Sequence, residues 1–179
     1  MSFNLANITA MDLDTGEFDP YYGPYVQIVS GLSLQQALLD SLSEISSLAD
    51  KVAAQSVLHH RCQAGKWSVA EIWQHLVDTE IIFQYRALRI ARGDTTNLAG
   101  FDQDEFVQQS RASGRNLEEL RQLMLAVRNS SLLLFQMFND EELKKRGVAS
   151  GSEISVRALG FLICGHQKHH FKIIRERYC

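Results

Sequence analysis

The sequence of 179 residues has only two prolines, three cysteines and no apolar run that approaches the roughly 20 residues needed to cross a bilayer. Both prolines lie before residue 25, so no proline interrupts a helix in the rest of the chain. The cysteines, Cys62, Cys164 and Cys179, are odd in number and widely spaced, which argues against a disulfide framework and fits free thiols. The acidic amino terminus lacks the order of a secretory signal. These absences predict a cytoplasmic protein that does not span a membrane.

A surplus of basic residues is also absent, because 18 Lys and Arg stand against 21 Asp and Glu, a formal net charge of -3. A protein that binds nucleic acid or an anionic membrane needs a basic surface to neutralise the phosphates. We therefore expect no nucleic-acid partner and no membrane partner. With 45% hydrophobic and 22% charged residues, residues 1–179 fit a single globular domain that buries its own core.

Apolar residues recur at helical spacing in four long stretches of the chain. Ser68, Asp102 and Asn116 each have a glutamate three residues further on, which is the capping-box pattern of a helix start. We predict long helices over residues 34–53, 69–92, 116–139 and 156–178, and a short helix that begins at Asp102 and ends before Gly114.

These elements predict an all-α fold, an antiparallel four-helix bundle in which the long link between the second and third helices permits a crossover. Residues 1–31 are expected to form an arm packed on the bundle. Both prolines and several aromatic residues fall within residues 18–25, which suits an extended segment rather than a helix. A short strand at residues 25–29 is the one strand pattern we find, and residues 146–152 are interpreted as a loop.

Three of the six histidines lie close together in the last predicted helix. Four residues, about one helical turn, separate His166 from His170, so both rings project from one face and can bind the same ion. That face also carries the apolar stripe of the helix, so the pair points inward. His169 is rotated about 100° from His170 and could replace it if the helix sat differently against its neighbours, but the stripe favours His170.

A further ligand must come from another helix, because two imidazoles do not make a stable site for a divalent metal. His75 is the candidate, since it lies among apolar residues of the second helix, where a buried neutral imidazole needs a partner. Three neutral histidines leave the ion an open position for water or substrate. Glu71 and Asp78 share the face of His75, and either carboxylate is a candidate to orient a ligand or the water.

These residues also have structural interpretations. A core histidine is often a hydrogen-bonded packing residue, and a helical histidine pair also occurs on solvated faces. Arg86 and Arg89 lie on nearly the same face as His75 and suggest an anion clamp. However, Arg86 lies about 16 Å along the helix from His75. Ion pairs with acidic residues of neighbouring helices are therefore the expectation for both arginines.

Together, the motifs resemble those of the DinB-like, or YfiT-like, four-helix proteins that are described as metal-dependent hydrolases. The matching segments are residues 65–68 with Glu71, His75 and Leu76, residues 78–80, residues 85–89 and 91–94, residues 100–102, and residues 165–170. The resemblance implies a bundle in which His75, His166 and His170 hold a zinc or nickel ion, and it implies a homodimer. Ile81 departs from the family pattern, where an arginine is expected, without affecting the ligands.

The resemblance leaves two kinds of reaction open, hydrolysis by an activated water and chemistry by an activated low-molecular-weight thiol. We predict a metal-dependent enzyme, a hydrolase or thiol S-transferase, whose partner is a small-molecule substrate or thiol. The alternative is a non-catalytic, stress-related bundle that binds a metal or a ligand. A third interpretation is an all-α interaction module whose histidines only pack.

Overall fold

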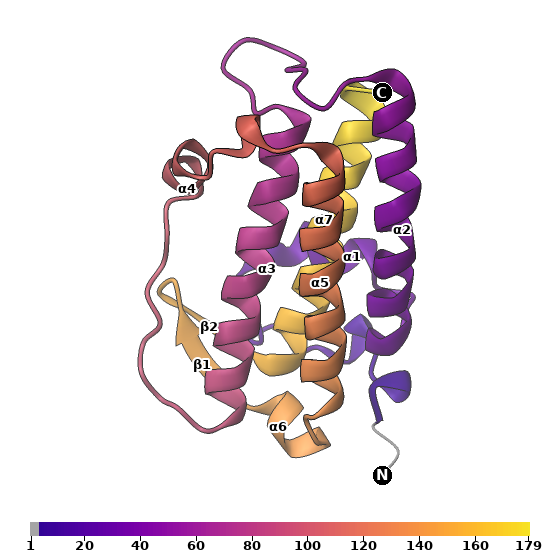
Figure 1. Ribbon diagram of the computed structural model, residues 1–179. Helices are drawn as coiled ribbons and strands as arrows, with labels where there is room; N and C mark the ends of the chain where they lie inside the picture. Colours follow the sequence, from indigo (N-terminus) through magenta and orange to yellow (C-terminus); the bar gives the residue numbers. More distant parts are fainter. Residues whose placement is uncertain (1–3) are drawn as a thin grey trace.

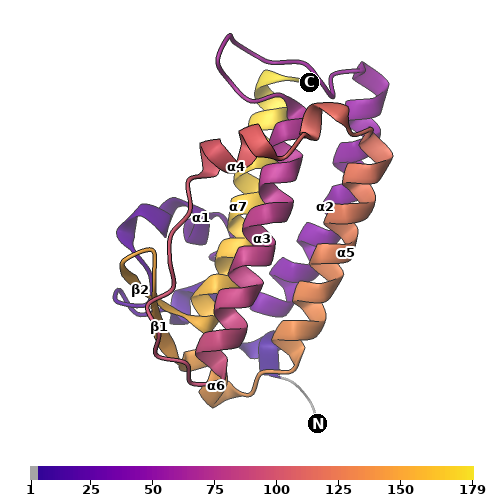
Figure 2. The same cartoon turned by 60° about the vertical axis from the view of Figure 1, so that its left-hand side comes forward.

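Four long helices form the body of the computed structural model, which describes residues 4–179. They are α2 (Leu34–Gln55), α3 (Val69–Ala91), α5 (Leu117–Gln136) and α7 (Val156–Arg177). Helices α2 and α3 each pack against both α5 and α7, so α2 and α3 lie diagonally across the bundle (Figures 1 and 2). The predicted all-α four-helix bundle is therefore confirmed.

The crossover between α3 and α5 sets the direction of the helices. After α3, the chain returns along the length of the bundle through α4 (Gln103–Gln109) and the short 3-10 helix η4 (Ala112–Gly114), and α5 then runs in the same direction as α3 (Figure 1). Helices α2 and α7 run the opposite way. The expected antiparallel arrangement thus does not hold for the neighbouring pairs α3–α5 and α2–α7, because the crossover brings the chain back to the end at which α3 began.

Side-chain caps define where the helices start. The predicted capping boxes at Ser68 and Asn116 are both present, and each pairs the cap residue with a glutamate three residues further on. Asp102 caps α4 by accepting hydrogen bonds from two backbone amides. A box that we did not predict, at Asn139, begins the short helix α6 (Asp140–Lys144), which follows the predicted range of the third helix.

The amino-terminal segment is helical where an extended arm and a short strand were expected. It forms the 3-10 helices η1 (Asn4–Asn7), η2 (Ala10–Asp12) and η3 (Pro20–Tyr22), followed by α1 (Gly23–Ile28). Each proline occupies the first turn of its helix, where the missing N–H is not needed and the fixed φ suits the helix. Residues 1–3 of the expected arm lie outside the described part. Helix α1 packs across α7, the helix that carries the histidine cluster.

A buried carboxylate holds this segment against the start of α7. The side chain of Glu17 accepts hydrogen bonds from Ser155 Oγ at 2.7 Å and from Arg157 Nε at 2.8 Å. Burial alone would raise the pKa of Glu17, but the hydrogen bonds from Arg157, Asp14 and Ser155 outweigh it and lower the pKa. The carboxylate is therefore charged at neutral pH and fixes the arm near the end of the bundle where α7 begins.

A β-hairpin stands where a loop was expected over residues 146–152. Strands β1 (Arg146–Ala149) and β2 (Ser152–Ser155) pair antiparallel. The two residues between them, Ser150 and Gly151, both have positive φ, 54° and 83°, as the tightest hairpin turns require. The crossover packs on this hairpin, because the backbone N–H of Leu98 donates to Val148 and that of Ser150 donates to the carbonyl of Leu98.

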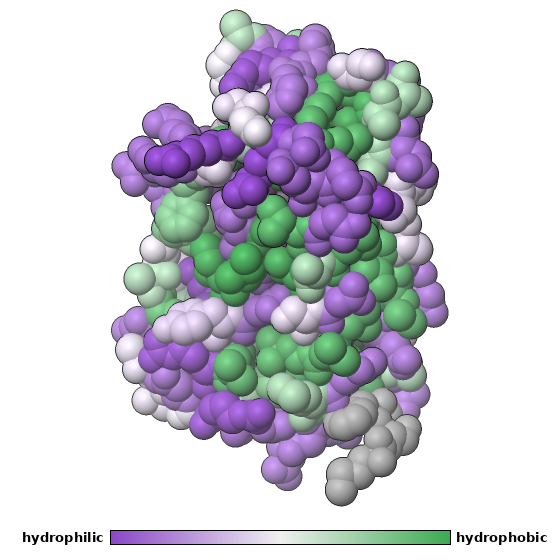
Figure 3. Space-filling model, in the orientation of Figure 1, coloured by the Kyte–Doolittle hydropathy of each residue, from purple (hydrophilic) through white to green (hydrophobic). Residues whose placement is uncertain are grey.

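Apolar surface gathers on the face of the bundle formed by α3 and α5 (Figure 3). The two helices expose several large apolar side chains, among them Ile81, Leu88 and Leu133, and Met137 is exposed just after α5. No helix in the described part of the chain is both long enough and apolar enough to cross a membrane.

Candidate metal centre

The three histidines singled out in the sequence meet in the interior of the bundle. His75 lies in the second turn of α3, and His166 and His170 lie one turn apart in α7. The Nε2 atom of His166 is 3.1 Å from the Nε2 atom of His75 and 3.1 Å from that of His170. One nitrogen from each of the three rings lies within 4.8 Å of the others. Helices α3 and α7 therefore aim three imidazoles at one point.

His169, the alternative to His170, faces a different group. Its ring packs edge-on against Tyr25 of α1, with the ring centroids 5.1 Å apart. Of the described residues, His75, His166 and His170 are the set of three whose nitrogens converge, and His169 is not part of it. The rotation of about 100° between neighbouring helical residues separates the two rings, as the apolar stripe of α7 suggested.

Burial keeps all three imidazoles neutral. It lowers the pKa of His75 to about 4 and that of His170 to about 3. The pKa of His166 is also well below its usual value, first because of burial and then because His170 and His75 are close. A neutral imidazole presents a lone pair, which is the form that binds a metal ion.

The donor set fits a divalent metal ion better than it fits a hydrogen-bonded trio. A neutral imidazole has one N–H, and the Nε2 atom of His166 cannot donate a single proton well to both neighbours. Around a tetrahedral zinc ion with Zn–N bonds of about 2.0–2.1 Å, ligand nitrogens are about 3.3 Å apart, close to the two observed separations of 3.1 Å. An ion that accepts all three lone pairs would satisfy the cluster.

The two carboxylates proposed to orient a ligand have other partners. Glu71 caps α3 through Ser68 and pairs with Arg61, while Asp78 accepts a hydrogen bond from Gln74. Among the described residues neither carboxylate is hydrogen-bonded to the three histidines, so a role for either in orienting a ligand or the water stays a prediction.

The polar atom near the outer nitrogen of His75 belongs instead to Thr79, one turn further along α3. Its Oγ1 atom lies 3.5 Å from Nδ1 of His75, at the outer limit of a hydrogen bond. Aromatic rings hold the imidazoles from the sides, with Trp67 4.8 Å from His75 and Tyr25 5.4 Å from His166 between ring centroids. The rings of His75 and His166 are thus fixed on more than one side.

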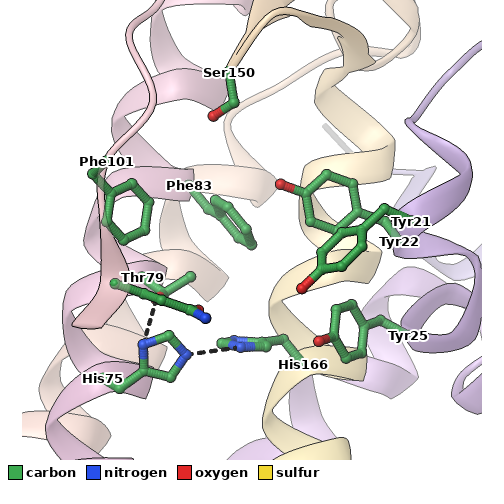
Figure 4. Close-up of a pocket in the computed structure, with 10 residues that line it drawn as sticks. Tyr21, Tyr22, Tyr25, His75, Thr79, Phe83, Phe101, Ser150 and His166 are labelled. Carbon is green, nitrogen blue, oxygen red and sulfur yellow. Dashed lines mark hydrogen bonds between the residues drawn. The ribbon is translucent and has the colours of Figure 1, made fainter. Parts of the chain in front are cut away.

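A cavity of about 250 Å³ opens directly above His75 and His166 (Figure 4). Its walls come from α3, α7, the amino-terminal helices, the crossover and the hairpin, and most of them are aromatic. The lining residues are Tyr21, Tyr22, Tyr25, His75, Thr79, Phe83, Phe101, Gln103, Ser150 and His166. The two histidines lie at one end of the cavity and Ser150 at the other. A small molecule in this cavity would touch the histidines directly.

The two arginines on α3 behave differently from each other and from expectation. Arg89 forms its ion pair with Asp94, in the turn that follows its own helix, not with a neighbouring helix. Arg86 is buried and forms no ion pair within the described residues. Its Nη2 atom donates to the carbonyl of Ala99 at 2.8 Å and to Ser150 Oγ at 2.9 Å. Sequence reasoning missed this arrangement because the hairpin and the crossover, which supply both acceptors, were not predicted to meet.

Trp73 is fully buried, and Cys164 is a buried free thiol whose pKa burial raises to about 11. The walls supplied by Tyr25 and Ser150 carried no recognisable signal, because they depend on how α1 and the hairpin fold back onto the bundle. Phe101, which also lines the cavity, was noted in the sequence only as part of the matching segment 100–102.

Comparison with known proteins agrees with this architecture. A family model described as the DinB superfamily matches residues 35–174. The structure of YfiT from Bacillus subtilis, described as a probable metal-dependent hydrolase with an unusual four-helix bundle topology, is similar with a TM-score of 0.70 and 17% sequence identity, covering 97% of this chain and 95% of that chain. At that identity the likeness shows the fold. No curated protein matches the chain. The match over residues 35–174 shows that the chain belongs to the DinB superfamily.

Proposed function

We propose that this protein is a metal-dependent enzyme in which His75, His166 and His170 hold a divalent ion that activates water or a low-molecular-weight thiol. The reaction is hydrolysis or thiol S-transfer. One observation carries the proposal: three neutral imidazoles converge on one point, and two of them border a cavity. The description of YfiT as a probable metal-dependent hydrolase supports the same class of activity.

The histidines would bind the ion, and the aromatic residues around them enclose the site. The three imidazoles hold the ion without neutralising its charge. Bound there, the ion supplies positive charge that lowers the pKa of a water or thiol beside it. Thr79 steadies His75 through Nδ1, and the rings of Tyr25 and Trp67 limit the rotation of the imidazoles. The mostly aromatic lining makes the cavity less polar than bulk water, which strengthens electrostatic interactions within it.

Zinc and nickel are the metals we propose. Imidazole nitrogens suit both ions, and three neutral nitrogen ligands leave a position for a further ligand. The cavity beside the histidines has a volume of about 250 Å³, so it admits a compact substrate or thiol next to the ion.

Measuring the metal content tests whether the three histidines hold an ion. Protein purified without a histidine tag is expected to hold about one zinc or nickel ion per chain. Replacing His166 with alanine should lower metal affinity by more than the roughly 10- to 100-fold that outer partners of a ligand contribute. His169→Ala is the matched control on the same helix and should retain the metal. A wild-type protein that binds no ion, or equal losses in both variants, would contradict the site.

Turnover assays test whether the metal-loaded protein is an enzyme. Metal-loaded protein is incubated with glutathione-like thiols and an electrophile, and separately with panels of esters and amides. Turnover that disappears in His166→Ala and persists in His169→Ala supports catalysis and identifies the reaction class. Stoichiometric metal without turnover in any panel would instead support the non-catalytic binding protein.

The proposal also places the protein in the cytoplasm as a homodimer. Three free cysteines are consistent with a reducing compartment, and the exposed apolar side chains of α3 and α5 offer a surface for a second copy. Light scattering of the purified protein measures the mass in solution, and a monomeric mass at micromolar concentration would contradict the homodimer.

A further inference from the structure

Arg86 brings a positive charge to the end of the cavity opposite the histidines. Its side chain is 2% exposed, and Nη2 donates to Ser150 Oγ, which lines the cavity. Two further cavity residues flank the guanidinium, because the rings of Phe83 and Phe101 each have their centroid 6.0 Å from its central carbon. Arg86 therefore stands directly behind the far wall of the cavity.

This charge has no counter-charge within the described part of the chain. No carboxylate lies within ion-pair distance of the guanidinium there, and its two hydrogen bonds go to a neutral carbonyl and a neutral hydroxyl. The nearby Tyr22 does not supply a negative charge, because burial raises the pKa of its phenol even though Arg86 opposes the shift. An arginine does not lose its proton in a protein, so a buried cation remains uncompensated.

The other buried arginine shows how this chain usually treats such a charge. Arg128 is also inside the bundle, and it forms a two-point ion pair with Glu80 at 2.8 Å through both Nε and Nη2. At Arg86, by contrast, both hydrogen bonds use Nη2, and Nε and Nη1 make none among the described residues. Arg86 thus retains donors suited to a carboxylate.

The length of the cavity separates the two polar ends. Arg86 follows His75 by eleven residues, about 16 Å along α3, and helical side chains lean toward the amino end, which brings the guanidinium back toward His75. Aromatic rings line the space between the histidines and Ser150 (Figure 4). A ligand that fills this space needs an apolar middle.

We propose that the natural ligand carries a carboxylate, received by Arg86 and Ser150 at the hairpin end of the cavity, with its reactive group at the histidines. The substrate of the function proposed above is then a short acid with an apolar body and a thiol or cleavable bond at the opposite end. The histidine end rests on the proposed function, whereas the carboxylate end rests on Arg86 alone.

The test compares two probes of equal length, 6-mercaptohexanoate and the neutral 6-mercapto-1-hexanol. Dissociation constants are measured by following NMR chemical shifts, both in zinc-loaded protein and in protein stripped of metal. In the wild type, the carboxylate is expected to bind about tenfold more tightly than the alcohol, as a charge-assisted contact predicts. Both probes bind more weakly without zinc, but their ratio persists, because it arises at the Arg86 end.

The variants assign the preference to Arg86. Arg86→Met removes the charge and should bring the ratio to about one, Arg86→Lys should restore part of it, and Arg89→Met, three residues further along α3, should leave it unchanged. Replacing an unpaired buried charge with an apolar side chain is often neutral or stabilising, so Arg86→Met should fold. Should it fail to fold, Arg86→Lys together with Ser150→Ala, which removes the hydroxyl, provides the comparison, and a lowered ratio in both is expected.

The outcomes separate the two proposals. A ratio near one in the wild type, or a tenfold ratio that survives Arg86→Met, overturns the carboxylate assignment. A thermal shift without a change in the ratio shows that Arg86 only holds the crossover and the hairpin together, and also overturns it. Failure of zinc to bind, with the ratio intact in the metal-free protein, overturns the metal site and leaves the acid-binding end supported.

Discussion

At the scale of single residues, the environment of His75 is set by a neighbour one helical turn away. Thr79 Oγ1 lies 3.5 Å from Nδ1 of His75, on the side of the ring opposite the converging nitrogens. A partner at the outer nitrogen determines which tautomer the imidazole adopts and how the ring is oriented. Thr79 also lines the cavity, so this residue contacts both His75 and the space that a ligand would occupy.

Thr79→Val retains the branched shape of the side chain but removes the hydroxyl. We expect metal affinity to fall by roughly tenfold, the lower end of the range for outer partners, because the hydrogen bond is long. Competition with a fluorescent zinc chelator measures the affinity. Thr95→Val, in the exposed turn after α3, is the control. Equal affinities for Thr79→Val and the wild type would show that the hydroxyl does not support His75.

At the scale of elements, the contact between α1 and α7 depends on the absence of a side chain. A Cβ atom at Gly165 would lie 2.1 Å from the backbone oxygen of Tyr25. Backbone cannot move aside as the end of a flexible side chain can. Gly165 thus allows α1 to cross α7 directly above His166, and this crossing positions the ring of Tyr25 against the imidazole.

Gly165→Ala should therefore force α1 away from α7. We expect the free energy of unfolding to fall by about 1–3 kcal/mol, the usual cost of overpacking, and metal binding to weaken because Tyr25 no longer supports His166. Denaturant titration and the chelator assay measure the two effects. Gly114→Ala is the control, since its added Cβ would meet nothing within 4 Å. A stable Gly165→Ala protein with normal affinity would mean that α1 is not needed above the site.

At the scale of the whole molecule, a buried polar network joins three of the four long helices. Glu80 of α3 pairs with Arg128 of α5, and Ser131 donates to the same carboxylate at 2.6 Å. Arg128 also donates to Ser41 of α2. Buried ion pairs contribute little when complete, but the loss of one partner leaves an uncompensated charge in the interior. The placement of α3, which holds His75, against α2 and α5 therefore depends on this network remaining complete.

Glu80→Gln removes the negative charge and leaves Arg128 unpaired. We expect the free energy of unfolding to fall by about 3–5 kcal/mol, measured by urea denaturation. Glu118→Gln breaks the exposed pair with Arg121 and should leave the free energy of unfolding almost unchanged, because solvent screens the pair. If the free energy of unfolding fell by similar amounts in the two variants, the buried position of the Glu80–Arg128 pair would not increase the cost of breaking it.

Part of the fold and of the site could be predicted because the signals are local. The starts of α3 and α5 depend on Ser68 and Asn116, whose caps act within three residues. The amino-terminal prolines misled because proline fits both an extended segment and the first turn of a helix. The hairpin was missed because its turn uses Ser150 in a left-handed conformation, which few residues other than glycine adopt.

The sequence by itself determined four amphipathic helices and the placement of His166 and His170 on one face, because helical periodicity and capping act between residues near each other in the chain. Only the tertiary structure decided that His75 completes the cluster, that α1 covers it, and that Arg86 has no counter-charge among residues 4–179 at the far end of the cavity. Each of these depends on contacts between segments far apart in the chain, and those contacts follow from how the crossover and the hairpin fold onto the bundle.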